Sequence, residues 1–142
     1  MENQKLNLLI VEENPFLVNV LRQALTPEFN VIAVANGIEA LDRLEYGSRI
    51  DFILTEINLP KLDGLELIRL VRLNILYKHL PILVISKFED SSSRIKCLES
   101  GADAYVAKPF NPLEVRARVR GMLRHTDSFS TKKATDIVPS YY

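Results

Sequence analysis

The feature that most constrains the fold is an alternation, repeated five times, between short apolar runs and segments with helical spacing. In the intervening segments apolar residues recur every three or four positions, and Asn, Asp or Ser stands where four of the five helices would begin. Strands separated by helices pair in parallel, and unbroken apolar strands indicate a sheet buried on both faces. We therefore predict an α/β fold with helices on both faces of a parallel sheet. The expected strands are 6–11, 29–35, 52–55, 82–86 and 103–108, and the expected helices are about 14–25, 38–47, 63–76, 90–100 and 111–124.

The totals restrict the class of protein. A length of 142 residues suits one domain, which we place at residues 1–125, with 126–142 as a polar tail or the start of a linker. The apolar runs are too short to cross a membrane, and the N-terminus lacks an export signal. The single cysteine, Cys97, excludes an internal disulfide and favours the cytoplasm. A formal net charge of zero argues against nucleic-acid binding by this chain.

Charged or polar side chains follow four of the five expected strands. Glu12 and Glu13 follow the first strand, Glu56 the third and Lys108 the fifth, while Ser86 ends the fourth. Any one of them could simply mark a strand reaching the surface. Function in parallel sheets collects at the carboxyl ends of the strands, however, and all five residues belong to that edge. The sequence therefore predicts a site made of three carboxylates, a hydroxyl and an ammonium.

Four segments in this order carry a resemblance to a known family: "LLIVEENPF", "DFILTEINLPKLDGLELI", "PILVIS" and "GADAYVAKPF". They resemble the receiver domain of two-component response regulators, over about residues 5–124. The resemblance implies a flavodoxin-like fold, with five parallel strands in the order 2-1-3-4-5. It also implies a signalling module, not an enzyme, whose partner is a histidine kinase or another signalling protein.

The resemblance also implies roles for the metal and acceptor positions. Glu12 and Glu13 match the acidic pair that binds magnesium, and Asn58 matches the residue whose main-chain carbonyl is a further ligand. Glu56 stands where the family has the aspartate that takes a phosphoryl group from the kinase.

Three more positions match the family around the acceptor. Ser86 and Lys108 match the residues that contact the phosphoryl group. Tyr105 matches an aromatic residue that changes rotamer on activation. The bond between Lys108 and Pro109 would be cis by the same analogy.

The site departs from the family at Glu56, Glu13 and Lys87. The extra methylene of Glu56 moves its carboxylate by up to ~1.5 Å, and a misplacement of about 1 Å can slow in-line transfer about 100-fold. Glu13 crowds a magnesium cage that needs near-ideal octahedral geometry. Three close carboxylates need a compensating cation. We hypothesise that Lys108, or Lys87 folding over the edge, supplies it, so that the site works partly or wholly without Mg²⁺.

The consequence of Glu56 for signalling has three open alternatives. A long carboxylate could imitate the phosphorylated state weakly, since it carries one negative charge where a phosphoryl group carries about two. The domain could instead be a permanently inactive scaffold, or keep residual phosphorylation. We favour the first.

The last expected helix carries arginines that suggest an output face, at Arg116, Arg118 and Arg120. The bland interpretation is a solvated face. "EVRARVRGMLR" most resembles receivers that precede a winged-helix DNA-binding domain and dimerise through the fourth helix, fifth strand and fifth helix. Acidic residues near the fifth strand pair with these arginines there; this chain has Asp103, but Ala104 replaces a second acid. We therefore expect a homodimer through this face that lacks one of the salt bridges of those receivers.

Other classes on the same fold fit less well. A hydrolase or phosphotransferase would need an aspartate nucleophile with a second acid two residues on, where this chain has Glu56 and Asn58. A flavin or nucleotide module would need a phosphate-cradling loop after the first strand, and "EENPF" is not one. An alternative within the family is a conventional, phosphorylatable receiver forming the N-terminal part of a winged-helix regulator.

Overall fold

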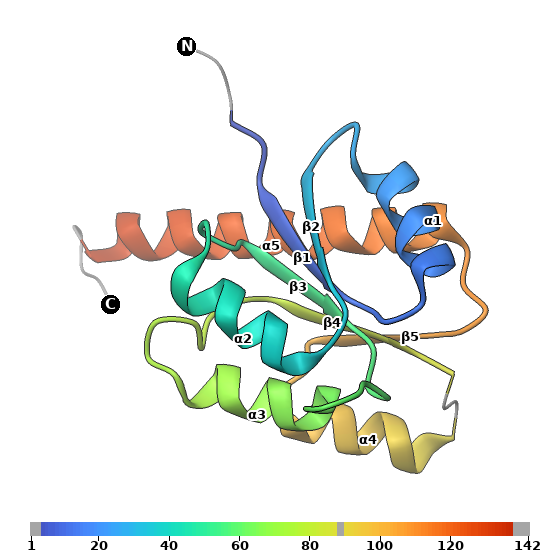
Figure 1. The fold of residues 1–142 in the computed structure, drawn as a ribbon. Helices are drawn as coiled ribbons and strands as arrows, with labels where there is room; N and C mark the ends of the chain where they lie inside the picture. The colour runs from blue at the N-terminus through green and yellow to red at the C-terminus, as the bar shows by residue number, and fades with distance from the viewer. Residues whose placement is uncertain (1–3, 88–89, 138–142) are drawn as a thin grey trace.

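The computed structural model describes residues 4–87 and 90–137, and side chains among them up to residue 125. Five parallel strands form one sheet in the order β2-β1-β3-β4-β5, as expected. α1 and α5 cover one face and α2, α3 and α4 cover the other (Figure 1). The strands are β1 (Asn7–Val11), β2 (Asn30–Val34), β3 (Phe52–Thr55), β4 (Ile82–Ser86) and β5 (Ala104–Ala107). The helices are α1 (Pro15–Leu25), α2 (Gly37–Tyr46), α3 (Gly64–Leu73), α4 (Ser91–Ser100) and α5 (Pro112–Ile137).

The unbroken apolar strands are explained by two cores, one on each face of the sheet. Successive side chains of a strand point to opposite faces. In β1, Leu9 and Val11 pack with α2, α3 and α4, whereas Leu8 and Ile10 pack with α1 and α5. All four are fully buried, and each contributes about 1.5–3 kcal/mol of burial free energy. An alternating polar strand would leave one of the two helical layers without a partner.

Side-chain caps start the helices where the sequence predicts them. Asn14 Oδ1 accepts hydrogen bonds from the amides of Phe16 and Leu17, and Pro15 occupies the first turn. Asn36, Asp63 and Asp90 cap α2, α3 and α4 in the same way. These caps satisfy amides that have no partner within the helix.

Two helix ends differ from the expectation. α3 stops at Leu73, not near residue 76, because Asn74 is extended and its side chain accepts a hydrogen bond from the amide of Leu76. Ile75, which falls inside the expected helix but beyond its observed end, is 74% exposed. α5 continues to Ile137, beyond the expected end near residue 124. No Gly or Pro follows Gly121 until Pro139, so nothing local ends the helix earlier.

Candidate functional site

The parallel register brings the residues after the strands together. The amide of Glu12 donates to the carbonyl of Val34, and the amide of Glu56 donates to the carbonyl of Val11, each at 3.0 Å. The amide of Lys108 donates to the carbonyl of Ser86 at 2.9 Å. Each ladder thus extends one residue past its strand, which fixes the backbone of the predicted site.

Lys108 bridges two of the three predicted carboxylates. Its Nζ lies 2.6 Å from Oε1 of Glu56 and 2.9 Å from Oε1 of Glu12. The side chains are little exposed, at 17% for Lys108, 9% for Glu12 and 6% for Glu56. The ammonium therefore supplies the cation that this acidic pair requires.

The second carboxylate oxygen of Glu56 turns back onto its own chain. Oε2 accepts hydrogen bonds from the amides of Ile57 at 2.7 Å and Asn58 at 3.0 Å. The carboxylate thus folds over the first amides of the loop after β3. Both oxygens of the acceptor-position residue are consequently engaged.

Burial and these donors act in opposite directions on Glu56. Burial raises the pKa of Glu56, but hydrogen bonds from Lys108 and Asn58, together with the nearby hydroxyl of Ser86, outweigh it and hold the pKa below its ordinary value. For Lys108, burial lowers the pKa, but Glu56 and Glu12 outweigh it and raise the pKa above its ordinary value. The pair is therefore charged, as a buried salt bridge.

Two buried hydroxyls lie beside this pair. Ser86 Oγ and Tyr105 Oη have no hydrogen-bond partner of good geometry among the described residues, although Ser86 is close enough to lower the pKa of both Glu56 and Tyr105. Burial is the largest influence on Tyr105 and raises its pKa. The predicted hydroxyl and aromatic positions thus adjoin Glu56.

Glu13, Asn58 and Lys87 lie at the solvent side of the site. All three are exposed, and they line a cleft of about 750 Å³ together with Glu56 and Lys108. Neither Glu13 nor Lys87 forms an ion pair with another described residue. Lys108 alone, therefore, bridges the carboxylates here, and Lys87 does not take the compensating position.

The carboxylates are chemically suited to Mg²⁺, but their arrangement does not fit it. Oε1 of Glu12 and Oε1 of Glu56 each accept a hydrogen bond from Nζ of Lys108. Oε2 of Glu12 accepts a hydrogen bond from the amide of Asn14 at 3.0 Å. Oε2 of Glu56 is occupied by amides. Among the described residues no group of three Asp, Glu, His or Cys side chains is arranged to hold a metal ion.

The backbone of Glu56 is also in direct contact with the start of α3. A β-carbon at Gly64 would collide with the carbonyl oxygen of Glu56 and lie 2.7 Å from Cα of Ile57. Gly64 is buried, and its amide donates to the carbonyl of Ile57 at 2.8 Å. Only glycine lets the helix approach the strand end this closely. The bond between Lys108 and Pro109 is cis, as expected.

The three arginines of α5 that the sequence assigns to an output face have different surroundings. Arg120 pairs with Glu28, which follows α1, at 2.7 Å, and Arg116 is half-buried, with an Nε that has no partner among the described groups. Arg118 pairs with Glu114 of its own helix at 3.8 Å. Arg120 thus faces α1, not α4.

Asp103 pairs with an arginine that the sequence analysis missed. Arg72 in the last turn of α3 lies 2.9 Å from its carboxylate, and the amide of Ile82 donates to the same oxygen. Arg72 also donates to the carbonyls of Lys78, Leu80 and Gly101. An arginine at a helix end carries no sequence signal for such a role, so the expected pairing of Asp103 with α5 is replaced by one with α3.

Fold and site together define a doubly wound α/β domain with a buried charge cluster at the carboxyl edge of its sheet. The chain belongs to the response regulator receiver domain family, which it matches over residues 8–120. It is 37% identical to a probable transcriptional regulator, ycf27, of Porphyra purpurea, over 92% of this chain and 53% of that protein. The chain thus spans about half the length of the curated relatives of this kind.

Solved structures agree with this assignment. A response regulator from Chloroflexus aurantiacus is 35% identical, with a TM-score of 0.80 over 85% of this chain and 99% of that chain. The receiver domain of the sensor histidine kinase PA1611 of Pseudomonas aeruginosa, which has magnesium coordinated in its active-site cleft, is 30% identical, with a TM-score of 0.77 over 84% and 98% of the two chains. Within the described part of the chain, no helix has the length and apolar character needed to span a membrane.

Proposed function

We propose that this chain is a receiver domain of two-component signalling that works without phosphorylation of Glu56 and without a resident metal ion. One observation carries the proposal: Lys108 bridges Glu12 and Glu56, while two backbone amides occupy the remaining oxygen of Glu56. A carboxylate with three donors is a poor nucleophile, and a cage that already contains an ammonium repels a divalent cation. The domain acts by contact with other proteins, as a signalling module and not as an enzyme.

The charge cluster would then hold one conformation constitutively. In the family, Lys108 and Ser86 match residues that contact the phosphoryl group; in this chain the carboxylate of Glu56 takes up the lysine directly. The partner is a histidine kinase or another signalling protein in the cytoplasm.

The proposed output surface is the α4–β5–α5 face. Ile95 and Leu98 of α4 are large apolar residues with 52% and 46% exposure, and Leu113 of α5 has 57%. Exposed apolar groups of this kind mark interaction sites when they cluster. A homodimer through this face stays a candidate, although Asp103, the acid expected to pair with an arginine of α5, already pairs with Arg72. Light scattering on the native chain and Ile95→Asp decides whether the face pairs with itself.

A second candidate is a conventional receiver belonging to a longer transcriptional regulator. The observation that favours it is the length of the curated relatives, about twice that of this chain. In that case Glu56 or a neighbouring side chain would accept a phosphoryl group, and Glu13, Glu12 and the Asn58 carbonyl would bind Mg²⁺.

Treatment with acetyl phosphate and Mg²⁺, followed by intact-mass spectrometry, tests the proposal. We expect no phosphoryl adduct on the native chain and an adduct on Glu56→Asp, whose shorter carboxylate restores the residue that the family has at the acceptor position. Glu56→Ala is the matched negative control. Calorimetric titration with Mg²⁺ should show no binding at millimolar concentration. A stable adduct on Glu56, or Mg²⁺ binding that disappears in Glu13→Ala, would favour the second candidate.

A further inference from the structure

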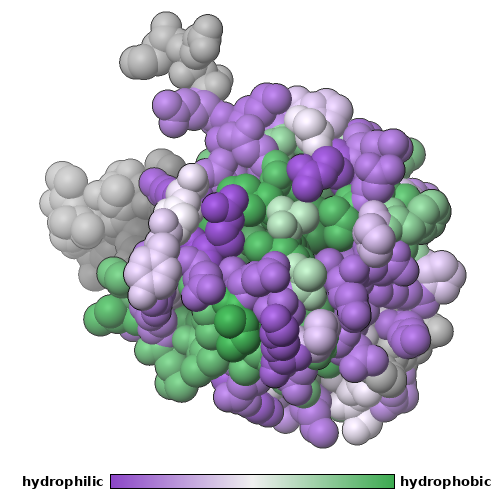
Figure 2. All heavy atoms as spheres, in the orientation of Figure 1, coloured by the Kyte–Doolittle hydropathy of each residue, from purple (hydrophilic) through white to green (hydrophobic). Residues whose placement is uncertain are grey.

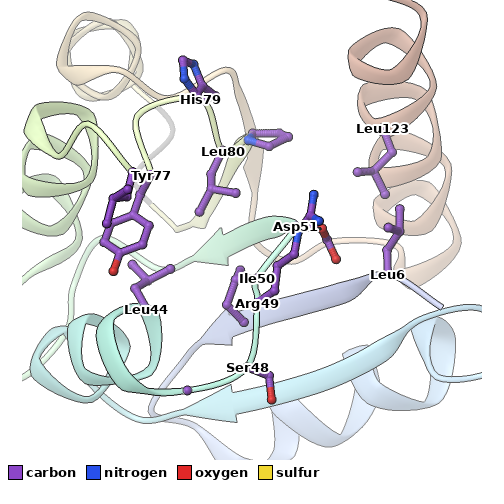
Figure 3. Close-up of a pocket in the computed structure, with 13 residues that line it drawn as sticks. Leu6, Leu44, Ser48, Arg49, Ile50, Asp51, Tyr77, His79, Leu80 and Leu123 are labelled. Carbon is purple, nitrogen blue, oxygen red and sulfur yellow. Dashed lines mark ion pairs between the residues drawn. The ribbon is translucent and has the colours of Figure 1, made fainter. Parts of the chain in front are cut away.

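A second cavity lies at the amino-terminal edge of the sheet, opposite the charge cluster. Its volume is about 500 Å³, within the range of small-molecule ligand pockets. Leu6, Ile50 and Pro81, which precede β1, β3 and β4, form its floor, with Leu44 of α2 and Leu123 of α5 on its sides. Figure 3 shows the aliphatic side chains of Leu44, Ile50, Leu80 and Leu123 around one hollow, with His79 at its rim.

Large exposed aliphatic residues continue this cavity onto the surface. Leu73, Ile75 and Leu76 have 81%, 74% and 76% exposure, and Leu76 also lines the cavity. Figure 2 shows apolar surface at its left edge, over the end of α3 and the loop that follows. Single exposed apolar residues are ordinary, but three within four positions beside a cavity mark a surface suited to an apolar partner group.

The charges around the cavity indicate the charge that a partner should carry. Lys5, Lys78 and Arg124 adjoin lining residues in the sequence, are exposed and form no ion pair with another described residue. The one carboxylate that lines the cavity, Asp51, is already neutralised by Arg49 at 3.1 Å and accepts the amide of Asn7. Glu45, which is next to the lining residue Leu44 in the sequence, is an exposed acid. Among the residues next to the lining in the sequence, exposed bases without a described ion pair therefore outnumber exposed acids, and Lys5, Lys78 and Arg124 are called the basic rim.

We propose that this cavity, with the patch formed by Leu73, Ile75 and Leu76, is a docking site for an acidic polypeptide segment of a partner protein. An aliphatic side chain of the segment enters between Leu44, Ile50 and Leu123, while flanking carboxylates pair with the basic rim. A few buried anchor side chains supply most of the affinity in protein interfaces, and complementary charges select the partner and its orientation. The site lies at the other end of the strands from Glu56 and does not depend on its chemistry.

The test uses a fluorescein-labelled peptide with two adjacent leucines between glutamates, titrated into the ¹⁵N-labelled full chain. We expect saturable chemical-shift changes at Leu44, Ile50 and Leu80, with a Kd tighter than about 1 mM, weakening as salt increases. A peptide with lysines in place of the glutamates should bind at least ~10-fold more weakly, a loss of about 1.4 kcal/mol.

Surface variants distinguish binding at this site from nonspecific binding elsewhere on the surface. Leu76→Asn and Lys78→Glu change exposed side chains, so the fold should persist, and each should weaken the peptide about 5- to 10-fold. Leu98→Asn and Lys96→Glu on α4 are the matched controls and should leave the affinity unchanged. The proposal is overturned by no saturable shift at about 1 mM peptide, by equal binding of the lysine peptide, or by equal losses in the α4 variants. Binding to phosphatidylserine vesicles without binding to the peptide would overturn it as well.

Discussion

Lys108 Nζ lies 2.6 Å from Oε1 of Glu56 and 2.9 Å from Oε1 of Glu12, so that one ammonium joins the ends of β1, β3 and β5. Glu56 and Glu12 are 52 and 96 positions away from Lys108 in the sequence, and the three residues meet only through the parallel register. In a buried pair, the ammonium and carboxylates each offset the desolvation of the other.

Replacing Lys108 with methionine should destabilise the chain strongly. The change keeps the volume but leaves two buried carboxylates without a cation, which costs about 3 kcal/mol or more. Urea denaturation gives the free energy of unfolding. Lys87→Met, at an exposed residue outside the bridge, is the control and should change stability by less than about 0.5 kcal/mol. Equal effects of the two variants would contradict the assignment of the bridge to Lys108.

Stability should fall at acid pH because of Glu56. Its folded-state pKa is below the ordinary value of 4.5, so its contribution is full above pH 4.5 and is lost as the pH decreases through the folded pKa. In Glu56→Gln we expect a shallower decline between about pH 5 and 3. Glu99→Gln, an exposed control, should keep the native slope; a native slope in Glu56→Gln would show that another group titrates there.

Replacing Arg72 with methionine should loosen the loops before β4 and β5. The guanidinium contacts the carbonyls of Lys78, Leu80 and Gly101 as well as Asp103. We expect a loss of about 2–3 kcal/mol, with faster amide exchange at residues 78–80 and 101–103. Arg69→Met breaks only an exposed pair with Glu66 and should cost about 0.5 kcal/mol or less. Unchanged exchange in Arg72→Met would refute the role.

Replacing Tyr105 with phenylalanine should leave stability unchanged or raise it by up to about 1 kcal/mol. The change removes a buried hydroxyl that has no hydrogen-bond partner among the described residues, and an unpaired buried polar group costs about 1–3 kcal/mol. Thermal denaturation measures the effect. Tyr46→Phe, at 82% exposure, gives the baseline. A clear loss of stability in Tyr105→Phe would mean that the hydroxyl has a strong partner.

The sheet and the location of the site could be predicted from the sequence because both follow from local rules. Unbroken apolar strands such as β4 need cover on both faces, and parallel pairing then brings Glu12, Glu56 and Lys108 to one edge. The assignment of Glu13, Asn58 and Lys87 to the rim of the cleft agrees with that reasoning.

Choices between equivalent side chains could not be predicted. Lys87 and Lys108 both reach the edge in sequence terms, and only the geometry after β5 places Lys108 between the carboxylates. The backward turn of Glu56 depends on side-chain torsions that periodicity does not encode. The partners of Arg72 and Arg120 are far away in the sequence. The sequence suggested that Arg120 lies on a face shared with α4 and β5, whereas in the structure it pairs with Glu28 after α1.

The close approach of Gly64 to the carbonyl of Glu56 has a mechanical consequence. With no side chain between them, a movement of the end of β3 would press directly on the first turn of α3. The other end of α3, about 15 Å away, carries Arg72. Arg72 donates hydrogen bonds to Gly101 and Asp103, which lie in the loop before β5. Glu56 and the end of α4 are therefore linked through one helix, by a backbone contact at its start and a guanidinium at its end.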